Sequence, residues 1–405
     1  MTDNGLQSHL QLNTQVVKAR WRDSQQLWEV IDQHGVVRHC KILVPAIGGL
    51  SRPKWPQIKG LDSFAGSVIH SQQWPDQLNL AGKRVAVIGS GASAIQFVPH
   101  IARDARRLDL YQRSPQWILP KPDRPIGPMR RALYRHFPPA RLMVRFALYL
   151  LLESRLPAFN RFPWLSAFHR QKARRWLRRQ VPDPNLRRQL TPNYAMGCKR
   201  VLMSNDFYPA LMQKNVELVT TPIAAVSPQG IVDSQGRHRQ CHIIILATGF
   251  MATDPVPKDL ITGRDGCDLA KQWRQAGPSA YKGTTVPGFP NLFMLLGPNT
   301  ALGHNSVLLM IESQFNYLLD ALDYLDRTGA VSVEVSVESR EEWNRQLNRR
   351  LQNTVWNRGG CASWYLHPRS GRNTTLWPDF TYRFRRLTRR FDPDAYKVHT
   401  KVSYY

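Results

Sequence analysis

The sequence has few cysteines, few acidic residues and no long apolar run. Its five cysteines are scattered and never form a CxxC pair, which argues against a disulfide framework or a cysteine-ligated metal site and favours a reducing compartment. Residues 1–11 are polar and lack the apolar core of an export signal. The most apolar stretch, residues 146–152, is far too short to span a bilayer. We therefore expect a cytoplasmic protein with no metal site; its cysteines are Cys40, Cys198, Cys241, Cys267 and Cys361.

The shortage of acidic residues leaves a strong positive charge. The chain has 56 Lys and Arg against 29 Asp and Glu, a net charge of +27, and such a balance attracts anionic ligands, anionic lipid or nucleic acid. The basic residues concentrate in residues 124–200 and 372–390, among aromatic and aliphatic side chains. No basic zipper, zinc finger or aromatic RNA-binding signature accompanies them, so we expect no nucleic-acid partner. Solvated helix faces around an anion-binding enzyme are the favoured interpretation, and peripheral attachment to a membrane surface is the alternative.

Hydrophobic periodicity predicts an α/β chain of two or three domains. Residues 83–103 are typical of a strand, a turn and a helix, and the apolar run at residues 243–247 is typical of a buried parallel strand. Between residues 129 and 188, apolar residues recur at helical spacing among many arginines, which indicates an inserted helical subdomain. Further strands are expected at residues 10–19, 27–32, 41–45, 107–112, 216–220 and 292–296, helices at 207–213 and 308–328, and a Pro-rich linker at 50–56.

The strongest local signal is a GxGxxA fingerprint that directly follows an apolar strand and opens a helix. Gly89 permits the tight turn, Gly91 lets the backbone approach a pyrophosphate, and the small Ala94 lets helix and strand pack closely. The free amides at the start of the helix then bind the phosphates. We therefore predict a dinucleotide site made of Gly89, Ser90, Gly91, Ala92, Ser93 and Ala94.

The end of the following strand indicates which dinucleotide binds. A site for NAD usually places an acidic residue there to bond the ribose hydroxyls. This chain has Arg113 and Ser114 instead, with no carboxylate beside them. The guanidinium group has a fixed fork of donors that suits a 2′-phosphate, so NADPH is preferred over NADH. The alternative is that Arg113 is an ordinary surface arginine.

Phe64, Gly66, His70 and Trp74 follow the spacing FxGxxxHxxxW just before the fingerprint. This segment resembles the fingerprint of Baeyer–Villiger monooxygenases and the related pattern of flavin-containing monooxygenases, and Trp74 favours the Baeyer–Villiger version. The resemblance implies that the segment links an FAD domain to an NADPH domain, and that His70 helps to couple their movement. Without this spacing, His70 would more often be a structural residue.

The resemblance continues through the rest of the chain. Lys199 and Arg200 look like the family's Lys-Arg pair, which implies that Lys199 contacts the 2′-phosphate beside Arg113. Arg200 would then reach the flavin and stabilise an anionic peroxyflavin, a role suited to a side chain that cannot lose its proton. Thr248 and Gly249 resemble the family's ATG motif, and Asn299 and Thr300 lie in a stretch that resembles the lining of the flavin ring.

By this resemblance the fold is a Rossmann-like flavoprotein with two dinucleotide-binding domains, a helical insert and cofactors FAD and NADPH. The implied reaction inserts one oxygen atom from O2 into a small-molecule ketone, with oxygenation of a nitrogen or sulfur atom as the runner-up. The expected division is a remnant of the FAD domain plus linker at residues 1–80, an NADP-binding domain at 81–121 and 196–249, the helical insert at 122–195, and the C-terminal part of the FAD domain at 250–405.

One departure from the family pattern is large. Members begin with a strand and a GxGxxG that bind the ADP half of FAD, and neither is found here. We therefore expect an N-terminally truncated chain that lacks about 100 residues, close to one mononucleotide-binding half, and a missing FAD-domain segment or chain as a partner. Residues 243–247 and 292–296 would then lose neighbouring strands and expose apolar edges. A catalytically inactive NADP-binding remnant is the alternative of a different class.

Overall fold

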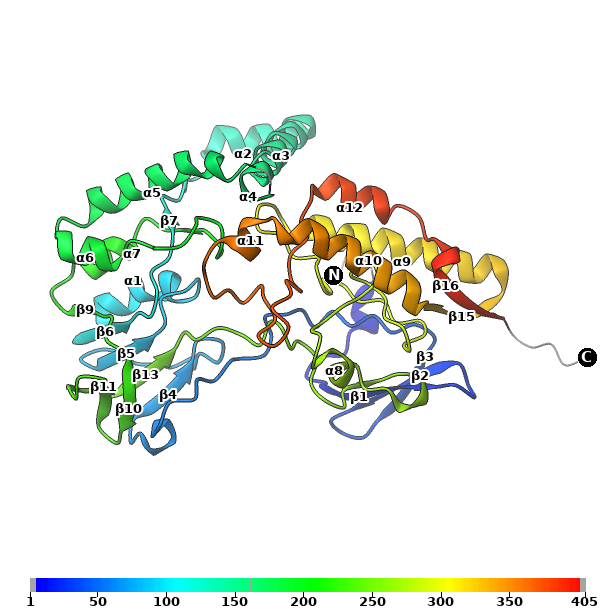
Figure 1. Cartoon of the computed structure of the whole chain (residues 1–405), viewed down its shortest axis with the longest axis horizontal. Coiled ribbons are helices and arrows are strands. Elements are labelled where there is room, and N and C mark those ends of the chain that lie inside the picture. Colours follow the sequence, from blue (N-terminus) through cyan, green and yellow to red (C-terminus); the bar gives the residue numbers. More distant parts are fainter. Residues whose placement is uncertain (1–4, 161, 401–405) are drawn as a thin grey trace, which may run out of the picture. The chain divides into compact units, whose positions relative to one another are not determined.

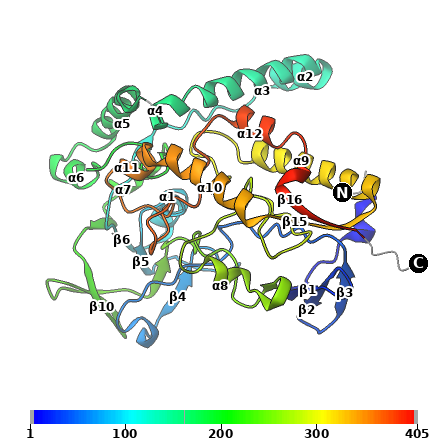
Figure 2. The same cartoon turned by 45° about the vertical axis from the view of Figure 1, so that its right-hand side comes forward.

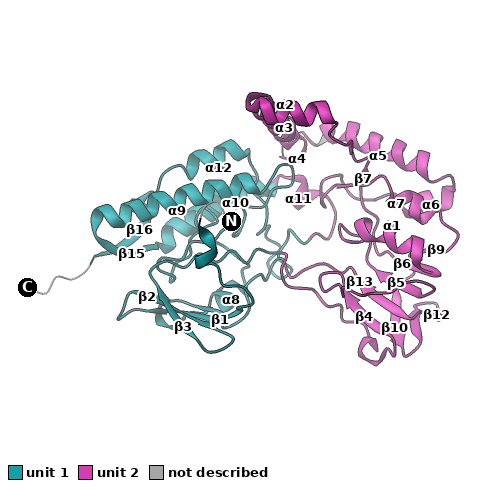
Figure 3. Cartoon of the chain, turned by 180° about the vertical axis from the view of Figure 1, so that it is seen from behind, with its two compact units in different colours: residues 1–49, 252–352, 364–405 teal, residues 50–251, 353–363 magenta. Residues whose placement is uncertain are grey.

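The chain folds into two compact units. Unit 1 contains residues 1–49, 252–352 and 364–405, and unit 2 contains residues 50–251 and 353–363 (Figure 3). The computed structural model describes residues 5–160 and 162–400. The first and the last of the predicted segments, residues 1–80 and 250–405, therefore lie partly outside the described residues. Residues 50–80, predicted to belong with residues 1–49, are part of unit 2, and so is the segment 353–363.

Unit 2 is built on a parallel sheet of five strands in the order β4-β13-β5-β6-β9 (Figure 1). Each neighbouring pair in it is parallel. Strand β13 pairs with β4 on one side and with β5 on the other, so it has no free edge. The strands are β4 (Ser67–His70), β5 (Arg84–Ile88), β6 (Arg107–Tyr111), β9 (Val216–Val219) and β13 (Ile243–Leu246).

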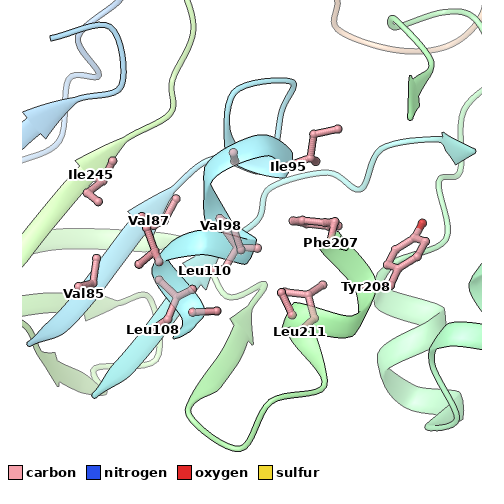
Figure 4. Close-up of a cluster of buried hydrophobic side chains, with 14 of the residues drawn as sticks. Val85, Val87, Ile95, Val98, Leu108, Leu110, Phe207, Tyr208, Leu211 and Ile245 are labelled. Atoms are coloured by element: carbon pink, nitrogen blue, oxygen red, sulfur yellow. The ribbon is translucent and has the colours of Figure 1, made fainter. Parts of the chain in front are cut away.

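Alternate side chains of the sheet face two different cores, as the two-residue period of a strand requires. Val85 and Val87 of β5 pack against helices α1 and α7 (Figure 4). Ala86 and Ile88 pack on the opposite face, with side chains of the antiparallel sheet β10-β11-β12. Strand β5 is apolar throughout because both of its faces are covered. The bounds are α1 (Ala94–Asp104), α7 (Phe207–Leu211), β10 (Ile223–Ser227), β11 (Gly230–Asp233) and β12 (His238–Gln240).

The segment between β6 and α7 is mainly helical, which agrees with the predicted insert. Helix α5 buries Ala173 and Leu177 and so packs on the body of unit 2, whereas most residues of α2 and α3 are exposed. Figure 2 shows the path of the backbone from α2 to α6. No helix in residues 5–160 and 162–400 is long and apolar enough to cross a membrane. The bounds of the remaining elements of unit 2, inside and outside this segment, are η3 (Leu61–Ser63), β7 (Ile118–Leu119), α2 (Pro128–His136), α3 (Pro138–Glu153), α4 (Leu156–Asn160), η4 (Pro163–Leu165), α5 (Ser166–Gln180), α6 (Pro184–Gln189), β8 (Leu202–Met203) and α11 (Val355–Arg358).

Unit 1 combines a small mixed sheet with a helical layer. Strand β1 pairs antiparallel with β2 and parallel with β14, and the fully buried Trp28 of β2 donates its indole N–H to the carbonyl of Pro290 at 2.9 Å. A second core forms between α9 and the antiparallel pair β15 and β16 around the fully buried Tyr317. The bounds are η2 (Leu6–His9), β1 (Val16–Arg22), β2 (Leu27–Asp32), β3 (Val37–Cys40), β14 (Ile261–Thr262), η5 (Arg264–Gly266), α8 (Leu269–Trp273), α9 (Leu308–Thr328), β15 (Ala330–Val335), α10 (Val337–Gln352), α12 (Thr381–Leu387), η6 (Pro393–Ala395) and β16 (Tyr396–Thr400).

Two of the predicted strands do not form. Residues 41–45 and 292–296 are loops that meet in one isolated parallel bridge between Leu43 and Leu292. The second run is buried but not extended, because Leu296 has a φ of 52°. The expectation that residues 243–247 would lack packing partners is also wrong, since β13 pairs on both sides within unit 2. Apolar runs in loops and strands look alike in sequence when both are buried.

Ile244 lies in the middle of β13 and is fully buried, so Ile244→Ala leaves a cavity that the close-packed sheet cannot fill. We expect the free energy of unfolding to fall by about 2–5 kcal/mol, measured by urea denaturation. Ile126→Ala makes the same substitution in unit 2 at a side chain that is 46% exposed. This control should change the free energy of unfolding by less than about 0.5 kcal/mol. Equal losses in the two variants would contradict the position of β13.

Candidate functional site

The predicted fingerprint forms a tight turn at the carboxyl end of β5. Gly89 has a φ of 108°, and its N–H donates to the carbonyl of Tyr111 at 2.9 Å. A Cβ atom at Gly89 would lie 2.5 Å from the carbonyl oxygen of Ala247, which follows β13. Only glycine meets both conditions, because other residues rarely adopt this φ and would collide with the neighbouring backbone.

The rest of the fingerprint leaves the start of α1 open. A Cβ atom at Gly91 would meet nothing within 4 Å, and Ala92 is exposed. Ser90 and Ala94 are buried, Ala94 within the core between α1 and the sheet. Ser93 is the N-cap residue but its side chain makes no capping hydrogen bond. The N–H groups of Ile95 and Gln96 donate to the carbonyls of Gly91 and Ser93 at 3.1 Å, so in the described part of the chain the donors without a backbone acceptor lie one step earlier, in the turn at Gly91, Ala92 and Ser93. An anionic group could bind to these amides.

A basic cluster lies where β6 ends. The ammonium group of Lys199 donates to the hydroxyl of Ser114 at 2.7 Å, although 85 residues separate them in sequence. Burial and the nearby Arg113 both lower the pKa of Lys199. In the described part of the chain, neither Arg113 nor Lys199 has a carboxylate partner. Two neighbouring cations without an acid are an arrangement suited to a doubly charged anion.

Tyr194 supports this cluster and was not predicted. The ammonium group of Lys199 lies 4.9 Å from the centre of the Tyr194 ring, over its face, an arrangement that favours a cation. The hydroxyl of Tyr194 donates to the carbonyl of Pro115 at 2.9 Å, and the indole N–H of Trp117 donates to the carbonyl of Tyr194 at 3.0 Å. No sequence signal marks Tyr194, because its position depends on hydrogen bonds with Pro115 and Trp117, which are 79 and 77 residues away in the sequence.

A disulfide bond holds the segment that carries Lys199 and Arg200. Cys198 and Cys361 are bonded across a sequence separation of 163 residues, so the prediction from scattered cysteines is wrong for this pair. Spacing along the chain does not report proximity in the fold. The other three cysteines are free. Arg200 itself is exposed.

His70 ends strand β4 and is buried. Its ring centre lies 5.8 Å from that of Trp55 and 6.1 Å from that of Phe250, and its Nδ1 accepts the N–H of Gln72 at 3.2 Å. Burial lowers the pKa of His70, and the backbone of Gly249 partly offsets the shift. The imidazole is therefore neutral at pH 7, which suits a positioning role more than proton donation.

Thr248 and Gly249 lie beside His70, at the carboxyl end of β13. The hydroxyl of Thr248 donates to the carbonyl of Lys54 at 2.6 Å, and the N–H of Lys54 donates to the carbonyl of Gly249 at 2.9 Å. Trp74 instead lies on the surface of α1, where its ring contacts Phe97 at 5.5 Å. The structure thus brings His70 and the ATG-like motif together and gives Trp74 a packing contact.

Asn299 and Thr300 belong to unit 1 and use their side chains to brace a loop. The amide of Asn299 donates to the carbonyls of Asn373 and Leu376 at 2.7 and 3.1 Å, and the hydroxyl of Thr300 donates to the carbonyl of Gly297 at 2.6 Å. Gln314 of α9 accepts the N–H of Leu296 at 2.9 Å from the same loop. Both predicted side chains are buried, so any contribution to a ligand comes from the loop they hold.

His70 and several of the residues predicted for the dinucleotide therefore share one edge of unit 2. His70 ends β4, Thr248 follows β13, Gly89 follows β5, and Arg113 follows β6. In an open parallel sheet the carboxyl ends of the strands meet along one edge, which is where such folds bind ligands. Among the described residues, no group of three or more His, Cys, Asp or Glu is placed to hold a metal ion.

The chain is similar to several known proteins. The family model described as flavin-binding monooxygenase-like matches residues 2–263. A protein from Pseudomonas aeruginosa named Baeyer-Villiger monooxygenase is 51% identical over 395 residues, covering 98% of this chain and 75% of the relative. The closed structure of cyclohexanone monooxygenase is similar with a TM-score of 0.85 and 26% identity, over 98% of this chain and 82% of that one. A structure of OTEMO in complex with FAD and NADP has a TM-score of 0.83 and 25% identity, over 97% and 82% of the two chains.

Gly89 and Gly91 separate a structural role from a binding role. Gly89→Ala places a side chain in a backbone conformation that costs about 1–3 kcal/mol, and the added Cβ atom collides with the carbonyl of Ala247. The midpoint of unfolding in urea should therefore fall. Gly91→Ala has open space and should leave that midpoint unchanged while it weakens dinucleotide binding measured by calorimetry. A stable Gly89→Ala protein would contradict the close approach of β5 and β13.

Proposed function

This chain belongs to the flavin-binding monooxygenase-like family, and from that membership we propose that it is an NADPH- and FAD-dependent monooxygenase of the Baeyer–Villiger type. Its reaction inserts one oxygen atom from O2 into a small-molecule ketone. The name of the relative from Pseudomonas aeruginosa and the cofactors in the OTEMO structure support this proposal. We place the enzyme in the cytoplasm, where NADPH is supplied.

The observation that carries the proposal is the basic cluster at the end of β6. Lys199 is fixed by Ser114 at 2.7 Å beside Arg113, on the strand that follows the fingerprint. That position corresponds to the ribose of a dinucleotide whose pyrophosphate lies at the start of α1. Two cations there favour a 2′-phosphate, so we assign the site to NADPH.

FAD supplies the hydride acceptor and the oxygen chemistry when it is bound. The GxGxxA fingerprint occurs once in the sequence, and we assign it to NADPH, with unit 2 as the NADP-binding domain and helical insert. Unit 1 is then the C-terminal part of the FAD domain. Its braced loop with Asn299 and Thr300 fits a positioning role beside the flavin, because three buried side-chain amides and hydroxyls fix its path.

The remaining roles follow from charge and position. The guanidinium of Arg200 is a permanent cation that stabilises negative charge on oxygen during transfer, which favours attack on a ketone over oxygenation of an amine or sulfide. His70 is neutral and enclosed by Trp55 and Phe250, so it contributes by holding the linker between the two cofactor regions. Trp74 supports this linker through its contact with Phe97 of α1.

Lys199→Ala and Arg113→Ala should each weaken NADPH binding about 10- to 100-fold, because a hydrogen bond to a charged group contributes about 1.5–3 kcal/mol. Binding of NADH should not change, since NADH has no 2′-phosphate. Calorimetric titration with both nucleotides measures the difference, and Arg103→Ala in the exposed last turn of α1 is the control. Equal losses for NADH would show that the cluster does not select the phosphate.

Arg200→Ala should lower ester or lactone formation from a ketone about 10²- to 10³-fold, the usual effect of removing one group that stabilises a transition-state oxyanion. Its affinity for NADPH should stay within about twofold, because the guanidinium does not contact the dinucleotide. The assay supplies FAD, NADPH and O2 and analyses products, after the visible spectrum of the desalted protein has established flavin retention. A colourless protein that still binds NADPH would support a NADP-binding protein without oxygenase activity, and N- or S-oxides as products would support the runner-up chemistry.

A further inference from the structure

The helices α2 to α5 carry a concentration of positive charge that the dinucleotide site does not use. Residues 128–180 contain twelve arginines and one lysine but a single acidic residue, Glu153, and Glu153 is buried. We call residues 128–180 the basic helical surface. Such a surface attracts an extended anionic partner, because its basic residues far outnumber its acidic ones.

The same surface exposes large apolar side chains. On α3, Phe146 and Leu150 are 61% and 50% exposed, and beyond it Trp164 and Phe168 are 70% and 69% exposed. Soluble proteins rarely leave so many large apolar side chains uncovered in one region. The remaining large apolar side chains of this surface with substantial exposure are Met129, Leu133, Phe137, Leu142, Met143, Val144, Leu148, Leu151, Phe162 and Leu165.

On α3 two arginines lie on one side, and exposed apolar side chains lie beside them and around the rest of the helix. Arg141 and Arg145 are four residues apart and so lie on one side of the helix. Leu142, Phe146 and Leu150 have the same spacing and lie together on another side. Helices with an arginine-rich side and a broad apolar side bind in the interfacial layer of a bilayer, with the apolar side inserted and the arginines at the headgroups.

The apolar and basic side chains continue from α3 to α5. Helices α2 and α3 pack together, and η4 contacts both α4 and α5. Within unit 2, α2 and α3 lie at the far end from the strands of the main sheet (Figures 1 and 3). Trp164, Phe168, Arg170 and Arg174 line a groove of about 580 Å³ on this surface. A tryptophan and arginines side by side suit the boundary between headgroups and acyl chains.

We propose that the basic helical surface is a docking site for a bilayer that contains anionic phospholipids. A second copy of the chain is disfavoured as the occupant, because two surfaces with thirteen basic residues each would repel one another. Nucleic acid is disfavoured because leucine, methionine and phenylalanine side chains that project from helices have no counterpart in a phosphate backbone. The helices lie on the membrane and do not cross it.

Cosedimentation with lipid vesicles tests the proposal. The intact chain should sediment with vesicles of phosphatidylglycerol and phosphatidylcholine and should bind pure phosphatidylcholine far more weakly. Raising the NaCl concentration should release it, because salt screens the arginines from the headgroups. The partition coefficient is measured in both lipids, and far-UV circular dichroism establishes that each variant is folded.

Two matched pairs of variants locate the contact. Phe146→Gln with Leu150→Gln should lower partitioning at least about tenfold, because two inserted apolar side chains are lost. Phe315→Gln with Leu319→Gln repeats the substitutions and spacing on α9, where these side chains are 44% and 55% exposed, and should have no effect. Arg141→Gln with Arg145→Gln should lower partitioning at least about fivefold, whereas Arg345→Gln with Arg349→Gln on the exposed side of α10 removes the same charge and should not.

Three outcomes would overturn the proposal. Equal binding to neutral and anionic vesicles would remove the role of the arginines. Equal effects of each variant and its control would mean that binding depends on net charge or general hydrophobicity and not on this surface. Absence of sedimentation, together with self-association that Phe146→Gln with Leu150→Gln abolishes, would assign the surface to a second copy. Each outcome is independent of FAD and NADPH, so it also leaves the proposed enzymatic function to its own tests.

Discussion

The close approach of β5 and β13 is the constraint on which the site in unit 2 depends. At Gly89 the backbone passes so near the carbonyl of Ala247 that no side chain fits between them. This contact aligns the carboxyl ends of β4, β13, β5 and β6, and so places His70, Thr248, the start of α1 and Arg113 along one edge. The parallel pairing explains why residues from distant parts of the chain lie along one edge of the sheet.

Charge is distributed unevenly over that sheet. On β6 the buried Asp109 is paired with Arg107 at 3.0 Å and Arg239 at 3.6 Å, because a buried carboxylate requires neutralisation. At the end of the same strand, Lys199 lies near enough to Arg113 for the guanidinium to lower its pKa, and neither side chain has a carboxylate partner among the described residues. Like charges held together cost stability unless an anion binds, so this uncompensated pair indicates a binding site, whereas the pairs around Asp109 indicate structure.

The positive charge of the chain therefore has two separable uses. A small, partly buried part of it, at Lys199 and Arg113, is positioned by specific partners such as Ser114 and Tyr194 and suits one phosphate group. The larger part, on the basic helical surface, is mostly exposed and interleaved with apolar side chains, and suits a fluid anionic surface. An enzyme that takes ketones from a membrane would gain from both features, since apolar substrates concentrate in the bilayer.

Local patterns were enough to predict the strand–turn–helix unit at residues 83–103, the strand at 27–32, the helix at 308–328 and the fingerprint glycines, because turn geometry and side-chain periodicity are properties of neighbouring residues. They also led to the prediction for Arg113, from its place at the end of the second strand, whereas Lys199 was predicted only through a family resemblance. The bond between Lys199 and Ser114, the ring of Tyr194 beneath it, and the disulfide of Cys198 and Cys361 were decided by the tertiary structure. The tertiary structure also decided that the apolar run at residues 292–296 is a buried loop without strand pairing. Sequence spacing carries no information on which distant segments meet in the fold, and these features depend on such meetings.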